Sequence, residues 1–241
     1  IHAFEPPLFE REGAKVTFVG NPALARDMAA ADPGRLRAEL QIGANDPILL
    51  ILPGSRASEI ERLTPPFEAA VNLLKADRPD LHLIVPAAET VAGLVKSRVA
   101  GWPHRVHVIE GEASRLAAMR AATVAMACSG TVTTELALAG CPMVVGYRLG
   151  NVTHFLARFI IRTPFITLVN IAAKAAVAPE MIQDACNGPA LAAELARRLD
   201  DPDLAARQVA AQNAALDLMG RGMGDPAGRA AEVVAGFLSR Q

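Results

Sequence analysis

The sequence has few cysteines, few aromatic residues and almost no excess of charge, and each shortage excludes a class of protein. The three cysteines, Cys128, Cys141 and Cys186, are too few and too scattered for a disulfide framework or a zinc cluster. Aromatic residues make up 4% of the chain, and 24 Lys and Arg face 25 Asp and Glu. A nucleic-acid partner, held by basic charge or by stacking on aromatic rings, is therefore not expected.

Long apolar runs and a signal peptide are also missing, because Gly, Pro or charged residues interrupt every hydrophobic stretch. Together with reduced cysteines, this predicts a cytoplasmic protein. The 241 residues, 51% of them hydrophobic, are enough to bury a core in one large domain or two small ones. The chain opens at Ile1 without Met, so we treat it as the C-terminal part of a longer protein.

Short apolar runs alternate with longer amphipathic stretches as far as Phe165. The runs are rich in Val, Ile and Leu, as strands covered on both faces are. This repetition predicts an α/β fold, a Rossmann-like parallel sheet with helices on both faces. We expect strands at 15–19, 48–52, 81–85, 106–109, 124–127 and 143–145, and helices at 58–75, 89–99, 114–121 and 133–139.

After Phe165 the pattern predicts helices only. We therefore expect a Rossmann-like domain at 1–185 and an all-helical C-terminal segment at 186–241 that packs on it. Asp203, after Pro202, is the expected N-cap of a long helix, which also explains the metal-like Asp-Pro-Asp spacing. The expected helices are 179–186, 190–199, 204–219 and 226–239.

The segment Leu-Pro-Gly-Ser-Arg at 52–56 follows a predicted strand and opens a helix. Ligands of such sheets bind at the carboxyl ends of the strands. Gly54 would let the backbone approach a ligand, Ser55 offers a hydroxyl, and Arg56 offers a planar fork for phosphate oxygens. The alternative is an ordinary turn in which Ser58 caps the helix and Arg56 lies in solvent.

A second turn of this kind, Ser129 to Thr131, follows the predicted strand at 124–127. Its hydroxyls and the helix start behind it suit a diphosphate, and Glu135, one helical turn further, could accept both hydroxyls of a ribose. Alternatively, Thr131 caps the helix and Glu135 interacts with the helix dipole. Neither a GxGxxG nor a GxxxxGK[ST] motif occurs. Two such turns in one sheet indicate a nucleotide-sugar site.

Three segments carry a family resemblance: Leu-Pro-Gly-Ser-Arg-x-x-Glu-Ile at 52–60, Ser-Gly-Thr-x-x-x-Glu at 129–135, and Gly-x-Pro-Met-Val-Val-Gly-Tyr-Arg at 140–148. They resemble the C-terminal portion of lipid-A-disaccharide synthase, with the family's N-terminal acceptor domain absent. The resemblance implies one half of a GT-B fold and an inverting, metal-independent glycosyltransferase. Such an enzyme joins UDP-2,3-diacylglucosamine to 2,3-diacylglucosamine 1-phosphate, giving lipid A disaccharide and UDP.

The resemblance also assigns site residues, without a metal or a cofactor. By this resemblance the diphosphate contacts Gly54, Ser55, Arg56, Ser129, Gly130 and Thr131. The ribose contacts Glu135, and the uracil contacts the loop of Gly111 and Glu112. The donor sugar contacts Glu59, Asn170 and Lys174. No catalytic base is assigned, because the family's catalytic carboxylate belongs to the absent domain. The sequence departs from the family at Asn21, where His is usual, and at 172–176, where the family's polar run often contains Arg and Lys174 would have to supply the charge.

The implied partners are the acylated donor and the acylated glucosamine phosphate acceptor, with no nucleic acid. The resemblance leaves open a homodimer and peripheral contact with the inner face of the inner membrane. An apolar helix face at 152–160, beside Arg148, Arg158 and Arg162, is either packed in the core or an interfacial patch for anionic lipid. Two other functions stay open: a UDP-sugar epimerase-like enzyme of the same architecture, and a non-catalytic nucleotide-binding module.

Overall fold

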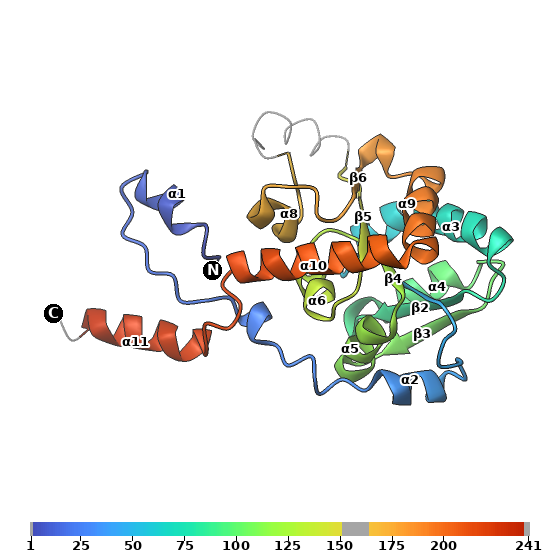
Figure 1. Cartoon of the computed structure of the whole chain (residues 1–241), viewed down its shortest axis with the longest axis horizontal. Helices are drawn as coiled ribbons and strands as arrows, with labels where there is room; N and C mark the ends of the chain where they lie inside the picture. The colour runs from blue at the N-terminus through green and yellow to red at the C-terminus, as the bar shows by residue number, and fades with distance from the viewer. Residues whose placement is uncertain (1, 151–163, 239–241) are drawn as a thin grey trace.

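The computed structural model describes residues 2–150 and 164–238. Within them, six parallel strands form one sheet in the order β3-β2-β1-β4-β5-β6 (Figure 1). The first strand therefore lies in the middle of the sheet. The next two strands extend the sheet on one side of it, and the last three extend it on the other side. The strands are β1 (Ile48–Leu52), β2 (His82–Ala87), β3 (Val106–Glu110), β4 (Val124–Ala127), β5 (Met143–Tyr147) and β6 (Glu180–Ile182). The predicted Rossmann-like parallel sheet is confirmed.

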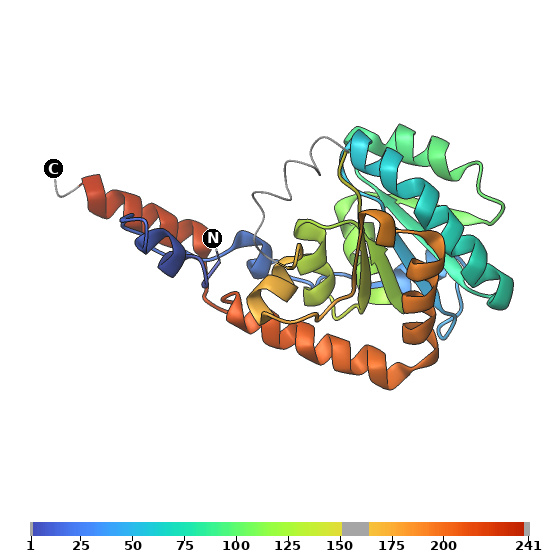
Figure 2. The same ribbon diagram turned by 90° about the horizontal axis from the view of Figure 1, so that it is seen from above.

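Helices cover both faces of this sheet (Figure 2). One face carries α3 (Ala57–Asp77), α4 (Ala92–Val99) and α9 (Gly188–Asp200). The other carries α2 (Pro33–Glu39), α5 (Glu112–Ala121), α6 (Thr131–Leu138), α8 (Leu168–Ala173) and α10 (Pro202–Leu218).

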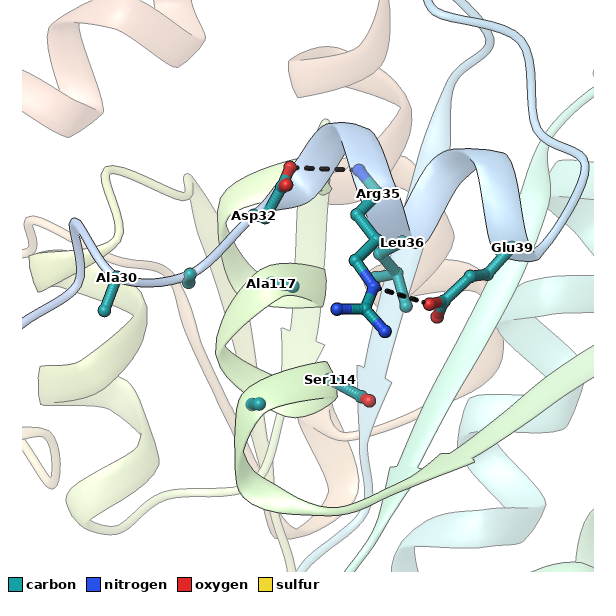
Figure 3. A pocket seen from close by; sticks show the side chains of 9 residues that line it. Ala30, Asp32, Arg35, Leu36, Glu39, Ser114 and Ala117 are labelled. Carbon is teal, nitrogen blue, oxygen red and sulfur yellow. Dashed lines mark hydrogen bonds and ion pairs between the residues drawn. The ribbon is translucent and has the colours of Figure 1, made fainter.

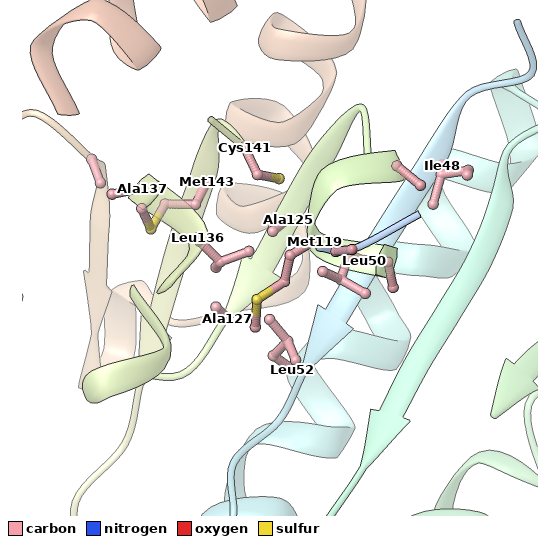
Figure 4. Close-up of a cluster of buried hydrophobic side chains, with 14 of the residues drawn as sticks. Ile48, Leu50, Leu52, Met119, Ala125, Ala127, Leu136, Ala137, Cys141 and Met143 are labelled. Atoms are coloured by element: carbon pink, nitrogen blue, oxygen red, sulfur yellow. The ribbon is translucent and has the colours of Figure 1, made fainter. Parts of the chain in front are cut away.

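The strand β1 shows why the sheet is buried on both sides. Ile48, Leu50 and Leu52 point to the core under α5 and α6, where they meet Met119 and Leu136 (Figure 4). The alternate residues of β1, such as Leu49, point to the core under α3. An apolar residue at every position is what a parallel strand between two helical layers requires.

Two glutamines fasten α10 to the start of β5. The Nε2 atom of Gln208 donates to the Met143 carbonyl at 2.8 Å, and Nε2 of Gln212 donates to the Cys141 carbonyl at 3.0 Å. Both glutamines are buried, so these bonds satisfy backbone groups at the sheet end that would otherwise be unpaired.

The helices α1 (Pro6–Glu10) and α11 (Pro226–Leu238) both lie outside the layered domain, on the same side of it (Figures 1 and 2). Neither contains a buried residue. The 3-10 turn η1 (Pro22–Ala25) contacts both α6 and α11, and so links α11 to the layered domain. Among the described helices, none combines the length and the apolar character that crossing a membrane requires.

One predicted strand and one predicted helix are wrong. Residues 15–19 belong to no strand, and Phe18 packs against Gly220 beyond the end of α10 instead of joining the sheet. The predicted helix at 179–186 is β6 followed by η3 (Gln183–Ala185), because β5 pairs with it: the Val145 amide donates to the Pro179 carbonyl at 2.9 Å.

The predicted N-cap of the long helix is also wrong. Pro202 takes the first helical position, and the Asp201 side chain accepts the Leu204 amide at 2.8 Å. The same Asp-Pro device begins α2, which the sequence analysis did not predict: the Asp32 side chain accepts the Arg35 amide at 2.9 Å. Proline at the first position loses no hydrogen bond, because that amide has no partner within a helix.

Candidate functional site

The strands β1 and β4 are neighbours where the chain order of the sheet reverses, and Leu52 and Ala127 at their ends are in register. The two motif turns therefore lie side by side, and the Cys128 amide donates to the Leu52 carbonyl at 2.8 Å. Between the turns is a pocket of about 440 Å³. It is lined by eight of the predicted site residues: Gly54, Ser55, Arg56, Glu59, Ser129, Gly130, Thr131 and Glu135.

In the first turn, at 54–56, the carboxylate of Glu59 binds the groups that could otherwise bind an anion. The Glu59 atom Oε2 accepts the amides of Ser55 at 3.1 Å and Arg56 at 3.3 Å, and its Oε1 accepts Nη1 of Arg56 at 2.7 Å. Glu59 thus takes the place of a bound anion at the start of α3. Arg56 is the N-cap, so the alternative in which Ser58 caps this helix is wrong.

Arg56 keeps donors for a ligand despite this pairing. Its side chain is 77% exposed, whereas that of Glu59 is 11% exposed. In the contacts that the structure describes, only its Nη1 is engaged. The remaining N–H groups of the guanidinium can still reach a phosphate from the open side of the pocket.

Gly54 is needed for a reason that the sequence analysis did not identify. Its φ of +128° lies where side chains are strained, and a Cβ atom there would lie 2.6 Å from both Cβ and Oε2 of Glu59. The expected close approach at Gly54 exists, and the group that approaches is Glu59.

The second turn is open. Gly130 is the N-cap of α6 with a φ of +154°, and a Cβ atom built on it would meet no atom within 4 Å. No side chain caps this helix, so the alternative in which Thr131 is the cap is wrong. The Ser129 hydroxyl donates to the Ile166 carbonyl at 3.2 Å. An uncapped helix start beside open space is suited to an anion.

Glu135 is held by two arginines that the sequence analysis missed. Both terminal nitrogens of Arg115 donate to its carboxylate, and Nη1 of Arg26 lies 2.5 Å from its Oε1. A carboxylate offers about four acceptor positions, and these contacts use three of them. Because the side chain of Glu135 is only 8% exposed, the arginines also neutralise a buried charge.

The other predicted contacts do not line this pocket. Gly111 is the N-cap of α5, and Glu112 reaches Arg26 at 3.2 Å. The fully buried Asn170 donates to the Ala178 carbonyl and to Glu180, each at 2.8 Å. Lys174 is exposed at the end of α8.

The region of Arg148 is described only in part. Its Nη2 donates to the Cys186 carbonyl at 2.6 Å, which joins the end of β5 to the segment after β6. The predicted apolar face at 152–160, with Arg158 and Arg162, lies outside the described residues.

Cys128 lines the pocket but is not an active nucleophile. Burial, followed by the nearby Glu59 charge, raises the pKa of its thiol to about 12. At neutral pH the group is a neutral, buried thiol. Among residues 2–150 and 164–238, no group of three or more His, Cys, Asp or Glu side chains is placed to hold a metal ion.

A second pocket, of about 220 Å³, lies between α2 and α5 (Figure 3). Its Arg35 is paired with Glu39 at 2.8 Å, and its Asp32 caps α2. It contains no residue of the two motif turns. The pocket between β1 and β4 is therefore the candidate site.

A parallel sheet in this strand order, with helices on both faces and two helix-opening turns at its switch point, is a Rossmann-like α/β domain. Half of a GT-B structure has this architecture. The MnaA-UDP co-structure of S. aureus is similar to the chain with a TM-score of 0.65 and 15% identity, over 99% of this chain and 58% of that one. At this identity the likeness shows the fold alone.

The family follows from the sequence comparisons. The family model described as lipid-A-disaccharide synthetase matches residues 1–234, and the chain belongs to this family. The lipid-A-disaccharide synthase of Rhodospirillum centenum is 37% identical over 238 residues, which are 99% of this chain and 59% of that protein. That of Ruegeria pomeroyi is 41% identical over 240 residues, 96% of this chain and 59% of that protein. The chain therefore spans about 59% of the length of these relatives.

Proposed function

We propose that this chain supplies the UDP-sugar side of a lipid-A-disaccharide synthase. The observation that carries the proposal is the single pocket formed by the two motif turns, in a chain that belongs to this family. The proposed donor is UDP-2,3-diacylglucosamine, and the acceptor is 2,3-diacylglucosamine 1-phosphate. The acyl chains of both would bring the enzyme to the inner face of the inner membrane, and a homodimer is a further proposal.

The proposed roles follow the geometry of the pocket. The open start of α6, at Ser129 to Thr131, takes the diphosphate together with Arg56. Glu135 holds the ribose through its remaining acceptor position. The backbone around Gly111 and Glu112 meets the edge of the uracil.

The residues proposed for the donor sugar differ in what they can still offer. Lys174 is exposed and does not line the pocket, so its proposed contact requires a donor sugar that extends beyond the pocket. The polar atoms of Asn170 and Glu59 are already engaged within the protein, so Glu59 is better suited to positioning Arg56.

In the proposed reaction, the acceptor hydroxyl oxygen forms a bond to the anomeric carbon while the bond from that carbon to UDP breaks. The electron pair leaves with the diphosphate, and the hydroxyl proton goes to a base that we assign to no residue of this chain. Arg56 and the start of α6 stabilise the charge that grows on the diphosphate, without a metal ion. We propose that transfer also needs the part of the relatives' length that the chain does not span.

The test is a product assay with the donor alone, the donor plus the acceptor, and UDP-N-acetylglucosamine. The chain is combined with the unmatched part of the Ruegeria pomeroyi relative. The expected result is lipid A disaccharide and an equal amount of UDP, only when the acceptor is present. Epimerised sugar nucleotide would favour the epimerase alternative, and UDP binding without any product would favour a non-catalytic module.

A further inference from the structure

A nucleotide base needs a flat surface, and this pocket has no aromatic ring to offer. Among the described residues that line it, none is Phe, Tyr, Trp or His. Its planar cations are the guanidinium groups of Arg56 and Arg115. Bases stack on guanidinium planes as well as on aromatic rings. The two arginines are therefore the candidates for the surface beneath the base.

The two guanidinium groups differ in which of their parts are available. Arg115 directs both terminal nitrogens at the Glu135 carboxylate, so two of its five N–H donors are used. Its side chain is 26% exposed, and its orientation is fixed by this two-point contact. With its orientation held by this pair, Arg115 can offer a base the face of its plane beside its remaining N–H groups. Arg56 is largely exposed and engages Glu59 through Nη1 alone, which leaves it donors for phosphate.

The backbone position of Arg115 agrees with a role beneath the base. Its amide donates to the Gly111 carbonyl at 3.1 Å, so it lies one helical turn after the loop proposed for the uracil edge. Its side chain ends on Glu135, the carboxylate proposed for the ribose. Arg115 thus lies between the two groups that the proposed function assigns to the nucleoside.

Glu135 is itself fixed from a second side. Nη1 of Arg26 holds Oε1 at 2.5 Å and also reaches Glu112 at 3.2 Å. The carboxylate is therefore oriented before any ligand arrives, and Arg115 is oriented by the carboxylate. A planar surface that is already in place loses little conformational entropy when a base stacks on it.

We infer that the guanidinium plane of Arg115 is the surface on which the base of the bound nucleotide stacks. The inference rests on the proposed function, since it needs a uridine nucleotide in the pocket. It assigns Arg115 to base recognition and Arg56 to phosphate recognition, so the two arginines have different ligands.

The test compares UDP with 5,6-dihydro-UDP, whose ring keeps the same hydrogen-bonding edge but is neither planar nor aromatic. The parent chain should bind UDP about tenfold more tightly than the dihydro compound. Arg115→Ala should bring the two affinities nearly together, and so should Arg115→Lys, which keeps the charge but loses the plane. Arg115→Tyr should restore the preference for UDP, because a ring can stack without charge.

Arg98→Ala is the matched control, since Arg98 pairs with Glu61 at 3.7 Å outside the pocket and its loss should leave the UDP preference unchanged. A ratio of affinities that stays constant in Arg115→Ala, even if both ligands weaken, would overturn the inference and assign Arg115 to holding Glu135. A parent chain without preference for UDP would overturn it as well, with the proposed function intact. A parent chain that binds neither ligand would instead contradict the proposed function.

Discussion

A Cβ atom on Gly54 would lie 2.6 Å from the Cβ atom of Glu59, so residue 54 can carry no side chain while Glu59 closes the start of α3. At Gly130 the same atom would enter open space in the pocket. The two motif glycines therefore serve different purposes. One makes room for an internal carboxylate, and the other leaves room above an uncapped helix start.

This difference predicts that the same substitution acts mainly on stability at Gly54 and mainly on UDP binding at Gly130. Gly54→Ala should destabilise the fold by roughly 3 kcal/mol, because strain at positive φ adds to a clash with Glu59. Gly130→Ala should cost about 1 kcal/mol of stability and should weaken UDP binding by more than it lowers stability. Urea unfolding and UDP titration of both variants measure the two effects. A Gly54→Ala protein as stable as the parent would contradict the role given to Glu59.

Arg56 is expected to bind phosphate through the donors that Glu59 leaves available. Arg56→Ala should weaken UDP binding by roughly 1.5–3 kcal/mol, the range for a hydrogen bond to a charged group. Arg56→Lys should recover only part of this, because the planar fork is lost. The melting temperature of each variant checks that the fold is kept. UDP affinity equal to that of the parent in Arg56→Ala would rule out the phosphate assignment.

The buried Arg198 should matter far more for stability than its exposed neighbour. Its Nη1 lies 2.7 Å from Glu194, and its Nε donates to Gln208 at 2.5 Å. Arg198→Ala should cost about 3 kcal/mol, because it leaves these acceptors without their buried partner. Arg197→Ala is the control: Arg197 also pairs with Glu194 but is 62% exposed, so its loss should cost less than about 1 kcal/mol.

Chemical denaturation with matched variants checks this prediction. The same helix and the same carboxylate are involved in both substitutions, so helix propensity is nearly constant between them. If the two variants unfold at the same urea concentration, the buried network does not hold α9 against α10.

The cysteines should resist alkylation in the native protein. Burial raises the pKa of Cys141 to about 12, and burial with the Glu59 charge does the same for Cys128. At pH 8 roughly one thiol in 10⁴ would then be a thiolate, which is the reactive form. Because these pKa values are raised on folding, the stability that they contribute should fall as the pH rises from about 9 toward 12.

Iodoacetamide labelling followed by mass spectrometry tests this. The native chain at pH 8 should stay unlabelled, and the same chain in denaturing urea should be labelled at Cys128, Cys141 and Cys186. Rapid labelling of Cys128 in the native state would contradict this prediction, because it would show that reagent reaches the thiol through the pocket.

The sequence predicts the inner strands better than the edge of the sheet. The segments 48–52 and 124–127 are continuous apolar runs between turn signals, and both are strands with these bounds. Glu180–Ile182 has only three residues and begins with a charged one, so its pairing with β5 decides its structure. No local pattern could have shown this, because the information lies in the partner strand.

The residues of the candidate site are likewise predictable only in part. Turns that follow strands can be read from the chain, and the fold brings eight of those residues into one pocket. The two arginines on Glu135 could not be found, since Arg26 is 109 positions from it and belongs to no motif. Only the packing of α5 and η1 against α6 places them there.

Calorimetric titration with UDP in the presence of EDTA tests the central claim most directly. The account predicts a saturable complex with one UDP per chain, formed without a divalent ion, because Arg56 and the start of α6 supply the positive charge for the diphosphate. Binding that develops only after addition of Mg²⁺ or Mn²⁺, or no binding under either condition, would contradict it.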